Sequence, residues 1–188
     1  MSVKKSFDIT SEWDGTPIEN PLDWTKMDIE LTEAGLHISV SSLCYADEVP
    51  STDPDRQKGT WGLWDYEVVE LFLVGENGHY TEIEMGPHGH HLVLQLDGPR
   101  SVVCKEIPMQ WEPLIQDGQW VGRGFVDKQW LPENIVRANA FAIHTLNGER
   151  RYCCYTPLPG QKPDFHQPDR FVLWDDIPNA KKDLQSTD

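Results

Sequence analysis

Apolar and polar residues alternate along most of this chain. Between residues 35 and 46, Leu36, Ile38 and Val40 share one parity, and polar residues lie between them. An alternation with a period of two is typical of a β-strand with one buried face. The pattern predicts a strand here and further strands at 80–85, 91–96, 101–107, 120–126, 140–146 and 149–155.

Short turn signals that combine Gly with Asn, Asp or Pro separate these strands, at 75–78, 86–89, 97–99, 117–118 and 147–148. Closely spaced strands joined by such turns are typical of antiparallel sandwiches. One short helix is expected, at 132–136. We therefore predict an all-β fold, a two-sheet antiparallel β-sandwich of the jelly-roll-like kind. A single domain is expected over 1–178, with a flexible polar tail at 179–188.

The chain carries a strong negative charge, which narrows the range of partners. Its 188 residues include 16 Lys and Arg against 31 Asp and Glu, so the formal net charge is −15. Nucleic acids and anionic membranes both require a basic surface on the protein that binds them. Neither is therefore expected as a partner.

The cysteines and the apolar runs indicate a cytoplasmic location. Cys44, Cys104, Cys153 and Cys154 form no Cys-x-x-Cys pair, so we interpret them as buried thiols in a reducing compartment. The two lysines near the start precede no apolar segment of the kind that a secretory signal needs. No apolar run approaches the roughly 20 residues of a membrane-spanning helix.

The densest group of candidate site residues lies in the segment 60–74. On a strand, Glu70 would share a face with large apolar residues, which is costly unless its carboxylate is paired or binds a ligand. Trp61, Trp64 and Asp65 precede it, beside the long polar loop 46–60. Tryptophans next to carboxylates suit sugars, whose C–H faces stack on indole while hydroxyls donate to carboxylates. The alternatives are a core tryptophan and a carboxylate satisfied by neighbouring groups.

The following segment adds Glu82 and Glu84 on one strand face, and His88, His90 and His91 around a turn. These are metal-ligand types, but on an extended strand His90 and His91 would face opposite ways, so no metal site is predicted. Glu82 and Glu84 would lie roughly 7 Å apart, within the range of paired glycosidase carboxylates. A solvated acidic strand face shows the same spacing, so we favour binding over catalysis.

Two further groups could contribute to a site. His144 lies on a strand that a turn joins to Arg150 and Arg151, and Arg151 could orient a ligand. Asp164 and His166 lie in a proline-rich loop, where a His–Asp pair could relay a proton. No partnered Ser or Cys nucleophile can be named, and no cofactor is expected.

The blocks LWDYEVVE, PHGHHLVL, FAIH and GQKPDFH resemble an uncharacterised family of animal and bacterial proteins, and this resemblance runs from roughly residue 13 to residue 171. Its human member is known as a chromosome-4 open reading frame of unknown function. The order of these elements also resembles the family 9 carbohydrate-binding modules and their sandwich relatives.

The resemblance to these modules implies a β-sandwich with a ligand cleft near the edge of one sheet. It implies that Trp64 is a stacking tryptophan and that Glu70 binds hydroxyl groups, with Trp61 as a second stacking residue by proximity. His144 stands where the modules often carry an arginine.

Together these observations predict an intracellular module that binds a small polar, carbohydrate-like ligand. The expected ligand-binding residues are Trp61, Trp64, Asp65, Glu70, Glu82, Glu84, His88, His144, Arg151 and His166. Two alternatives stay open. One is a hydrolase or isomerase that uses histidine and carboxylate chemistry in the same cleft, and the other is a protein-interaction domain with an exposed sheet edge or aromatic patch.

Overall fold

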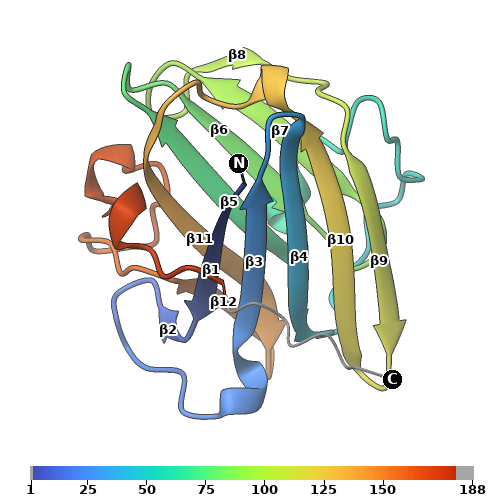
Figure 1. Ribbon diagram of the computed structural model, residues 1–188. Helices are drawn as coiled ribbons and strands as arrows, with labels where there is room; N and C mark the ends of the chain where they lie inside the picture. Colours follow the sequence, from blue (N-terminus) through green and yellow to red (C-terminus); the bar gives the residue numbers. More distant parts are fainter. Residues whose placement is uncertain (1, 181–188) are drawn as a thin grey trace, which may run out of the picture.

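The computed structural model describes residues 2–180 and consists of two antiparallel sheets, which form separate layers (Figure 1). The five-stranded sheet has the order β1-β3-β4-β10-β9. The eight-stranded sheet has the order β2-β12-β11-β5-β6-β7-β8, and β13 pairs with β11. The predicted all-β, two-sheet antiparallel sandwich is therefore confirmed. The tail expected at 179–188 lies mainly outside the described residues.

The strands of the five-stranded sheet are β1 (Val3–Ile9), β3 (Thr25–Leu31), β4 (Gly35–Leu43), β9 (Gln110–Gln116) and β10 (Gln119–Asp127). Those of the eight-stranded sheet are β2 (Ser11–Glu12), β5 (Val68–Gly75), β6 (Tyr80–Met85), β7 (His91–Leu96), β8 (Val102–Cys104), β11 (Ile135–Leu146), β12 (Glu149–Cys154) and β13 (Val172–Leu173).

Within residues 2–180 the helical content consists of short 3₁₀ turns: η1 (Pro21–Asp23), η2 (Leu63–Asp65), η3 (Lys128–Trp130), η4 (Pro168–Arg170) and η5 (Trp174–Asp176). The helix expected at 132–136 was wrongly placed. The turn η3 forms earlier because the Asp127 carboxylate accepts from the Gln129 N–H and caps it. Ile135 and Val136 already belong to β11. No helix among the described residues has the length and apolar character needed to cross a membrane.

Two of the predicted turns show why Asn-Gly and Asp-Gly pairs are good hairpin signals. Asp117 and Gly118 have φ of 53° and 76°, and Asn147 and Gly148 have φ of 54° and 81°. Positive φ at both central residues is the requirement of a type I′ hairpin turn, which Asn, Asp and Gly meet most readily. These turns fix the register of the β9–β10 and β11–β12 pairs.

The eight-stranded sheet is buried on both faces. Its inner face packs against the five-stranded sheet through residues such as Leu71 and Ile83, while Phe72, Tyr80 and Phe141 form a second apolar cluster on its outer face. Two adjacent cysteines follow this division, because Cys153 joins the inner core and Cys154 the outer cluster. Neighbouring residues on a strand point to opposite faces of a sheet, and this pair does so.

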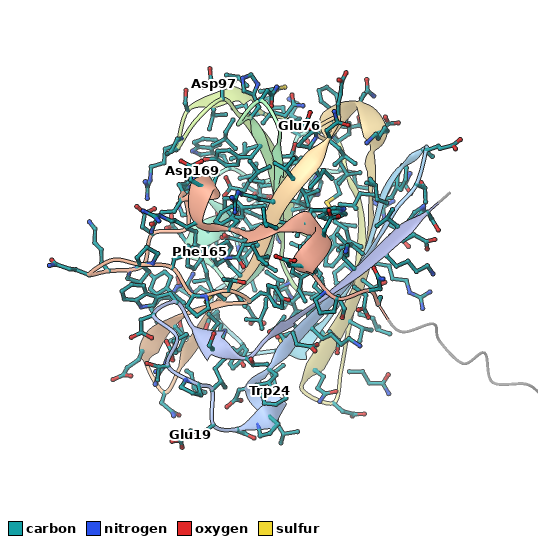
Figure 2. The ribbon with its side chains drawn as sticks, turned by 60° about the vertical axis from the view of Figure 1, so that its left-hand side comes forward. Glu19, Trp24, Glu76, Asp97, Phe165 and Asp169 are labelled. Atoms are coloured by element: carbon teal, nitrogen blue, oxygen red, sulfur yellow. The ribbon has the colours of Figure 1, made fainter. Side chains whose placement is uncertain are left out.

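Two segments cover this outer face. We call residues 61–66 the tryptophan segment and residues 157–171 the C-terminal cover. Leu63 of the first and Phe165 of the second are buried in the outer cluster. Figure 2 labels Phe165 and Asp169, both on the C-terminal cover. Burying each large apolar side chain under these segments stabilises the fold by roughly 1.5–3 kcal/mol.

Candidate functional site

Strand pairing brings three glutamates together on the outer face of the eight-stranded sheet. Glu70 of β5 lies opposite Glu84 of β6, and Phe72 lies opposite Glu82. Directly opposite residues share a face, and so do residues two apart on one strand. Glu70, Glu82 and Glu84 therefore form one group, which we call the carboxyl cluster. Their exposed fractions are only 2%, 4% and 0%.

The cluster holds protons at neutral pH. Burial, followed by the charge of Glu82, raises the pKa of Glu70 well above its ordinary value of 4.5. Burial, followed by the charges of Glu70 and Glu82, does the same to the pKa of Glu84. Burial also raises the pKa of Glu82 to about 7, while a hydrogen bond with Glu84 lowers it. Glu84 is thus the member of this pair that keeps its proton, and Glu82 is the member that ionises first.

Trp61 and Trp64 lie beside the cluster, and we call this pair the aromatic wall. Gly62 has a φ of 82° and leads into η2, which presents Trp64. Trp61 is 58% exposed, and its ring meets that of Trp64 edge to face at 5.1 Å and 81°. The side chain of Lys105 lies over Trp61, with its ammonium 5.1 Å from the ring centroid. A half-exposed indole pair of this kind offers apolar surface to a ligand.

Arg150 fastens the tryptophan segment to the sheet. Its guanidinium donates to the carbonyl oxygens of Trp64 (3.1 Å) and Tyr66 (2.6 Å). It also pairs with Asp47 Oδ2 at 3.0 Å. Since Arg150 is on β12 and Trp64 precedes β5, this contact fixes the aromatic wall relative to the floor of the site.

The C-terminal cover supplies the opposite wall. Asp164 pairs with Arg100 at 2.7 Å, and the Phe165 ring stacks on Phe141 with centroids 4.0 Å apart. Next to them, the hydroxyl of Tyr80 lies 2.7 Å from His166 Nδ1. These contacts hold His166 over the carboxyl cluster.

His166 is neutral, and its two ring nitrogens face different groups. Burial, followed by the charge of Arg100, lowers its pKa to about 4. The Tyr80 hydroxyl accepts from the Arg100 backbone N–H at 3.3 Å and lies 2.7 Å from His166 Nδ1, to which it donates when the ring proton is on Nε2. In this arrangement the ring proton lies on Nε2, which is 4.0 Å from Glu82 Oε2. His166 can therefore donate towards a ligand or towards the cluster.

These walls enclose a cavity of about 460 Å³. Pockets for small ligands typically measure roughly 300–1,000 Å³. The cavity has an acidic floor, aromatic sides and polar groups at its rim. Its lining residues are Trp61, Trp64, Asp65, Glu70, Glu82, Leu94, Leu96, Arg100, Val102, Ile143, Tyr152, Pro163, Asp164, Phe165 and His166.

Most of the predicted site residues meet at this cavity. Six of the ten line it, and a seventh, Glu84, is buried directly beside Glu70. The sequence could show that Glu70 shares a strand face with large apolar residues. It could not show that Glu82 and Glu84 are also buried, because the segments that cover them come from distant parts of the chain. The six lining residues are Trp61, Trp64, Asp65, Glu70, Glu82 and His166.

The other three predicted residues lie elsewhere. His88 is exposed in the turn between β6 and β7. His144 is buried on the inner face, stacked on Tyr45 at 3.7 Å, and burial lowers its pKa to about 4. Arg151 pairs with Glu12 and Glu149. The expectation that these three contact the ligand is not supported by their positions.

Sequence reasoning missed four contributors to the site: Arg100, Tyr80, Tyr152 and Arg150. Arg100 has a φ of 60° in the turn that follows β7, and nothing in the local pattern marks it as functional. The choice between Arg150 and Arg151 depends on strand parity. Arg150 lies two residues before Tyr152 on β12, so the two side chains share a face of the sheet, and Tyr152 lines the cavity. This spacing was the signal in the sequence that could have favoured Arg150 over Arg151.

The metal alternative gains no support from the geometry. Within the part of the chain that the structure describes, no three His, Cys, Asp or Glu side chains are arranged to hold a metal ion. His90 and His91 are both buried, and His90 Nε2 contacts the Thr52 carbonyl oxygen at 2.7 Å. All four cysteines are free thiols: Cys153 and Cys154 are buried, while Cys44 and Cys104 are half-buried.

The fold is similar to that of a solved structure. A protein from Bacteroides uniformis, described as a "putative carbohydrate-binding protein", superimposes with a TM-score of 0.62. The match covers 90% of this chain and 84% of the other, at 14% sequence identity. This likeness confirms the carbohydrate-binding-like sandwich architecture and, at that identity, shows the fold alone.

Sequence relatives cover most of the chain, although no family model matches it. The mouse protein "UPF0462 protein C4orf33 homolog" is 36% identical over 172 residues, 88% of each chain. The human UPF0462 protein C4orf33 is 33% identical over 168 residues, which are 85% of this chain and 82% of the human one. The zebrafish homologue is 33% identical over 172 residues. On this evidence the chain belongs to the UPF0462 family, as its sequence blocks predicted.

Proposed function

We propose that this protein is a binding module for a small polar, carbohydrate-like ligand, which occupies the cavity on the outer face of the eight-stranded sheet. One observation carries the proposal: a half-exposed tryptophan pair stands beside buried carboxyls in a cavity of about 460 Å³. A sugar ring has apolar C–H faces and a rim of hydroxyl groups. The site offers a complementary surface for each.

The residues take distinct roles in this proposal. Trp61 and Trp64 stack against the apolar face of the ring, and this stacking excludes water from one side of the ligand. Glu70 and Glu82 accept hydrogen bonds from hydroxyl groups. His166 Nε2–H donates to a ligand oxygen, and Glu84 supports Glu82 from within the sheet. The Bacteroides uniformis neighbour, described as a "putative carbohydrate-binding protein", supports the same ligand class.

Thermal-shift titration against mono- and disaccharides tests this function. A ligand present at 100 times its dissociation constant stabilises the folded state by about 2.7 kcal/mol. The shift should disappear in Trp64→Ala. It should persist in Trp24→Ala, a matched control whose ring is 43% exposed and does not line the cavity. No shift with any sugar, or equal loss in both variants, would contradict the proposal.

A second candidate function is acid–base catalysis on the same ligand class. It is favoured by one contact, His166 Nε2 facing Glu82 Oε2 at 4.0 Å. With a pKa of about 7, Glu82 keeps a proton that a general acid could deliver near neutral pH. Hydrolysis of aryl glycosides that is lost in Glu82→Gln would support this candidate. Binding without turnover would leave the protein a binding module.

We also propose that the protein works in the cytoplasm. The four cysteines are free thiols, a state that a reducing compartment maintains. Fractionation of cells expressing the tagged protein tests the location, and recovery from an oxidising compartment would contradict it.

A further inference from the structure

The floor of the cavity carries acidic groups with no cationic partner. Among the described residues, the ion pairs formed by Lys and Arg do not include Glu70, Glu82 or Glu84. Glu82 Oε2 and both oxygens of Glu84 have no hydrogen-bond partner outside the cluster. Buried carboxyls are normally paired or fully hydrogen-bonded. The cluster therefore keeps acceptor and donor capacity that a ligand in the cavity can use.

The nearby arginines cannot complete it, because each already has a partner. Arg100 Nη2 is 2.7 Å from Asp164 Oδ1 at the rim. Arg150 pairs with Asp47 and donates to two carbonyl oxygens of the tryptophan segment. In the free protein, protons neutralise the cluster instead. A cation that entered the cavity could replace one of these protons.

The aromatic wall favours such a cation. The face of an indole ring attracts an ammonium group within about 6 Å of the ring centroid. Lys105 already uses Trp61 in this way at 5.1 Å. Trp64 and Tyr152 add aromatic surface to the same cavity. One ammonium group in the cavity could therefore make a cation–π contact with these rings and pair with a carboxylate of the cluster.

We propose that the ligand carries an ammonium group, which binds to Glu70 and Glu82 on the floor of the cavity while the ring stacks on the tryptophan pair. This inference rests on the proposed function and specifies its ligand class, an amino sugar. Glu82 qualifies as the anchor because it lines the cavity, is only 4% exposed and has an unpartnered Oε2.

Binding should release a proton. When the ammonium approaches, one O–H bond of the cluster breaks, its proton passes to the buffer, and the carboxylate that remains pairs with the ligand. Other charged or titratable groups also face the cluster: Asp65 from the tryptophan segment, Arg100 from the turn after β7, Asp164 and His166 from the C-terminal cover, Tyr80 from β6 and Arg150 from β12. His166 stays neutral above its pKa of about 4, so the proton comes from the cluster.

Isothermal titration with matched ligands tests the inference. The probes are glucosamine against N-acetylglucosamine, and 2-aminoethyl glucoside against 2-hydroxyethyl glucoside. We expect an amine member to bind at least about tenfold more tightly than its neutral counterpart at pH 7. Titration in two buffers of different ionisation enthalpy should show release of about one proton per ligand. The affinity of 2-aminoethyl glucoside, whose amine stays charged, should rise from pH 6 to pH 8.

Variants identify the carboxyls involved. Glu70→Gln and Glu82→Gln keep the shape of a protonated carboxyl, and each should reduce the preference for the amine. Glu112→Gln is the matched control, because Glu112 is exposed on β9 of the other sheet. Equal binding of both members of each pair, or amine binding without proton release by the unmodified protein, would overturn the ammonium inference and leave sugar binding intact. Failure of all four probes and of the wider sugar panel would reject the proposed function itself.

Discussion

Glu70 on β5 lies directly opposite Glu84 on β6, and both side chains are buried on the outer face of the eight-stranded sheet. Directly opposite residues have Cβ atoms only about 4.5–5.5 Å apart. Two carboxyls at that separation, away from water, cannot both ionise without a large cost. The pairing therefore keeps protons on the cluster at neutral pH, and it places the cluster at the floor of the cavity. The stability of the fold should depend on the ionisation of the cluster, and under our proposal ligand binding should depend on it too.

Replacing Glu84 with Gln should stabilise the protein above pH 7. Because the pKa of Glu84 is higher in the folded protein than its ordinary 4.5, the folded state holds more protons than the unfolded state above pH 4.5. Stability then falls as pH rises. Glu84→Gln removes this loss, and we expect a gain of about 1–3 kcal/mol at pH 8.5.

Urea unfolding at pH 5.5, 7 and 8.5 measures this effect. The difference between Glu84→Gln and the unmodified protein should grow with pH, whereas Glu112→Gln should show no such trend. If the stabilities of all three proteins changed with pH in parallel, the folded state would not raise the pKa of Glu84, and the prediction would be wrong.

The two tryptophans of the aromatic wall should differ in their effect on stability. Trp61 is 58% exposed, so Trp61→Ala should cost less than about 1 kcal/mol of unfolding free energy. Trp64 is half-buried against the outer cluster, so Trp64→Ala should cost about 1–3 kcal/mol. Both variants should lose sugar binding in titration calorimetry. Full binding by Trp61→Ala would restrict the stacking surface to Trp64.

The strands β5 and β6 show which structural features could be predicted from the sequence. Alternation predicted β6 at its observed bounds and placed Glu70 on a face with Phe72, because side-chain direction has a period of two. It also left open a solvated face for Glu82 and Glu84. The choice depended on the C-terminal cover, whose path over the sheet is a tertiary property that no local pattern contains.

β11 and the segment before it show a second limit. His144 was correctly assigned to the face opposite Ile143, but that did not indicate exposure, because β11 is buried on both faces. The 132–136 segment has a Pro that suits the start of a helix, yet it leads directly into β11. In both cases the packing of neighbouring elements decided between structures that the local sequence allowed equally.

Two adjacent arginines on β12 provide a matched pair of variants. Arg150 holds the tryptophan segment through Trp64 and Tyr66, whereas Arg151 pairs with Glu12 and Glu149 away from the cavity. Arg150→Ala should cost about 2–4 kcal/mol, because it leaves the Asp47 carboxylate, whose side chain is 8% exposed, without its cationic partner. It should also weaken ligand binding by loosening the aromatic wall.

Arg151→Ala should leave ligand binding unchanged. Hydrogen exchange can follow the wall directly, since the amides of residues 61–66 should lose protection in Arg150→Ala alone. Equal loss of binding in both variants would show that the charge of β12, rather than the contacts of Arg150, governs the site.

The sandwich itself depends on a close approach in the five-stranded sheet, at Gly122 of β10. A Cβ atom at this position would overlap the ring of Trp111 on β9. That ring cannot easily move, because its Nε1–H donates to the Gly86 carbonyl oxygen at 2.8 Å and it packs edge to face against Trp120 at 6.0 Å. Overpacking of a well-packed site costs roughly 1–3 kcal/mol and sometimes more.

Gly122→Ala should therefore lower the unfolding free energy by about 3 kcal/mol. The matched control is Gly98→Ala, because an added Cβ there meets no atom within 4 Å and Gly98 has no positive φ. Its stability should change by less than about 0.5 kcal/mol. Chemical denaturation measures the unfolding free energy of the two variants. Equal values would mean that β9 and β10 can move apart to accommodate the added methyl group without loss of stability. Trp111 and Trp120 are both buried near Gly122, at the site of the clash. Their fluorescence should therefore change in Gly122→Ala.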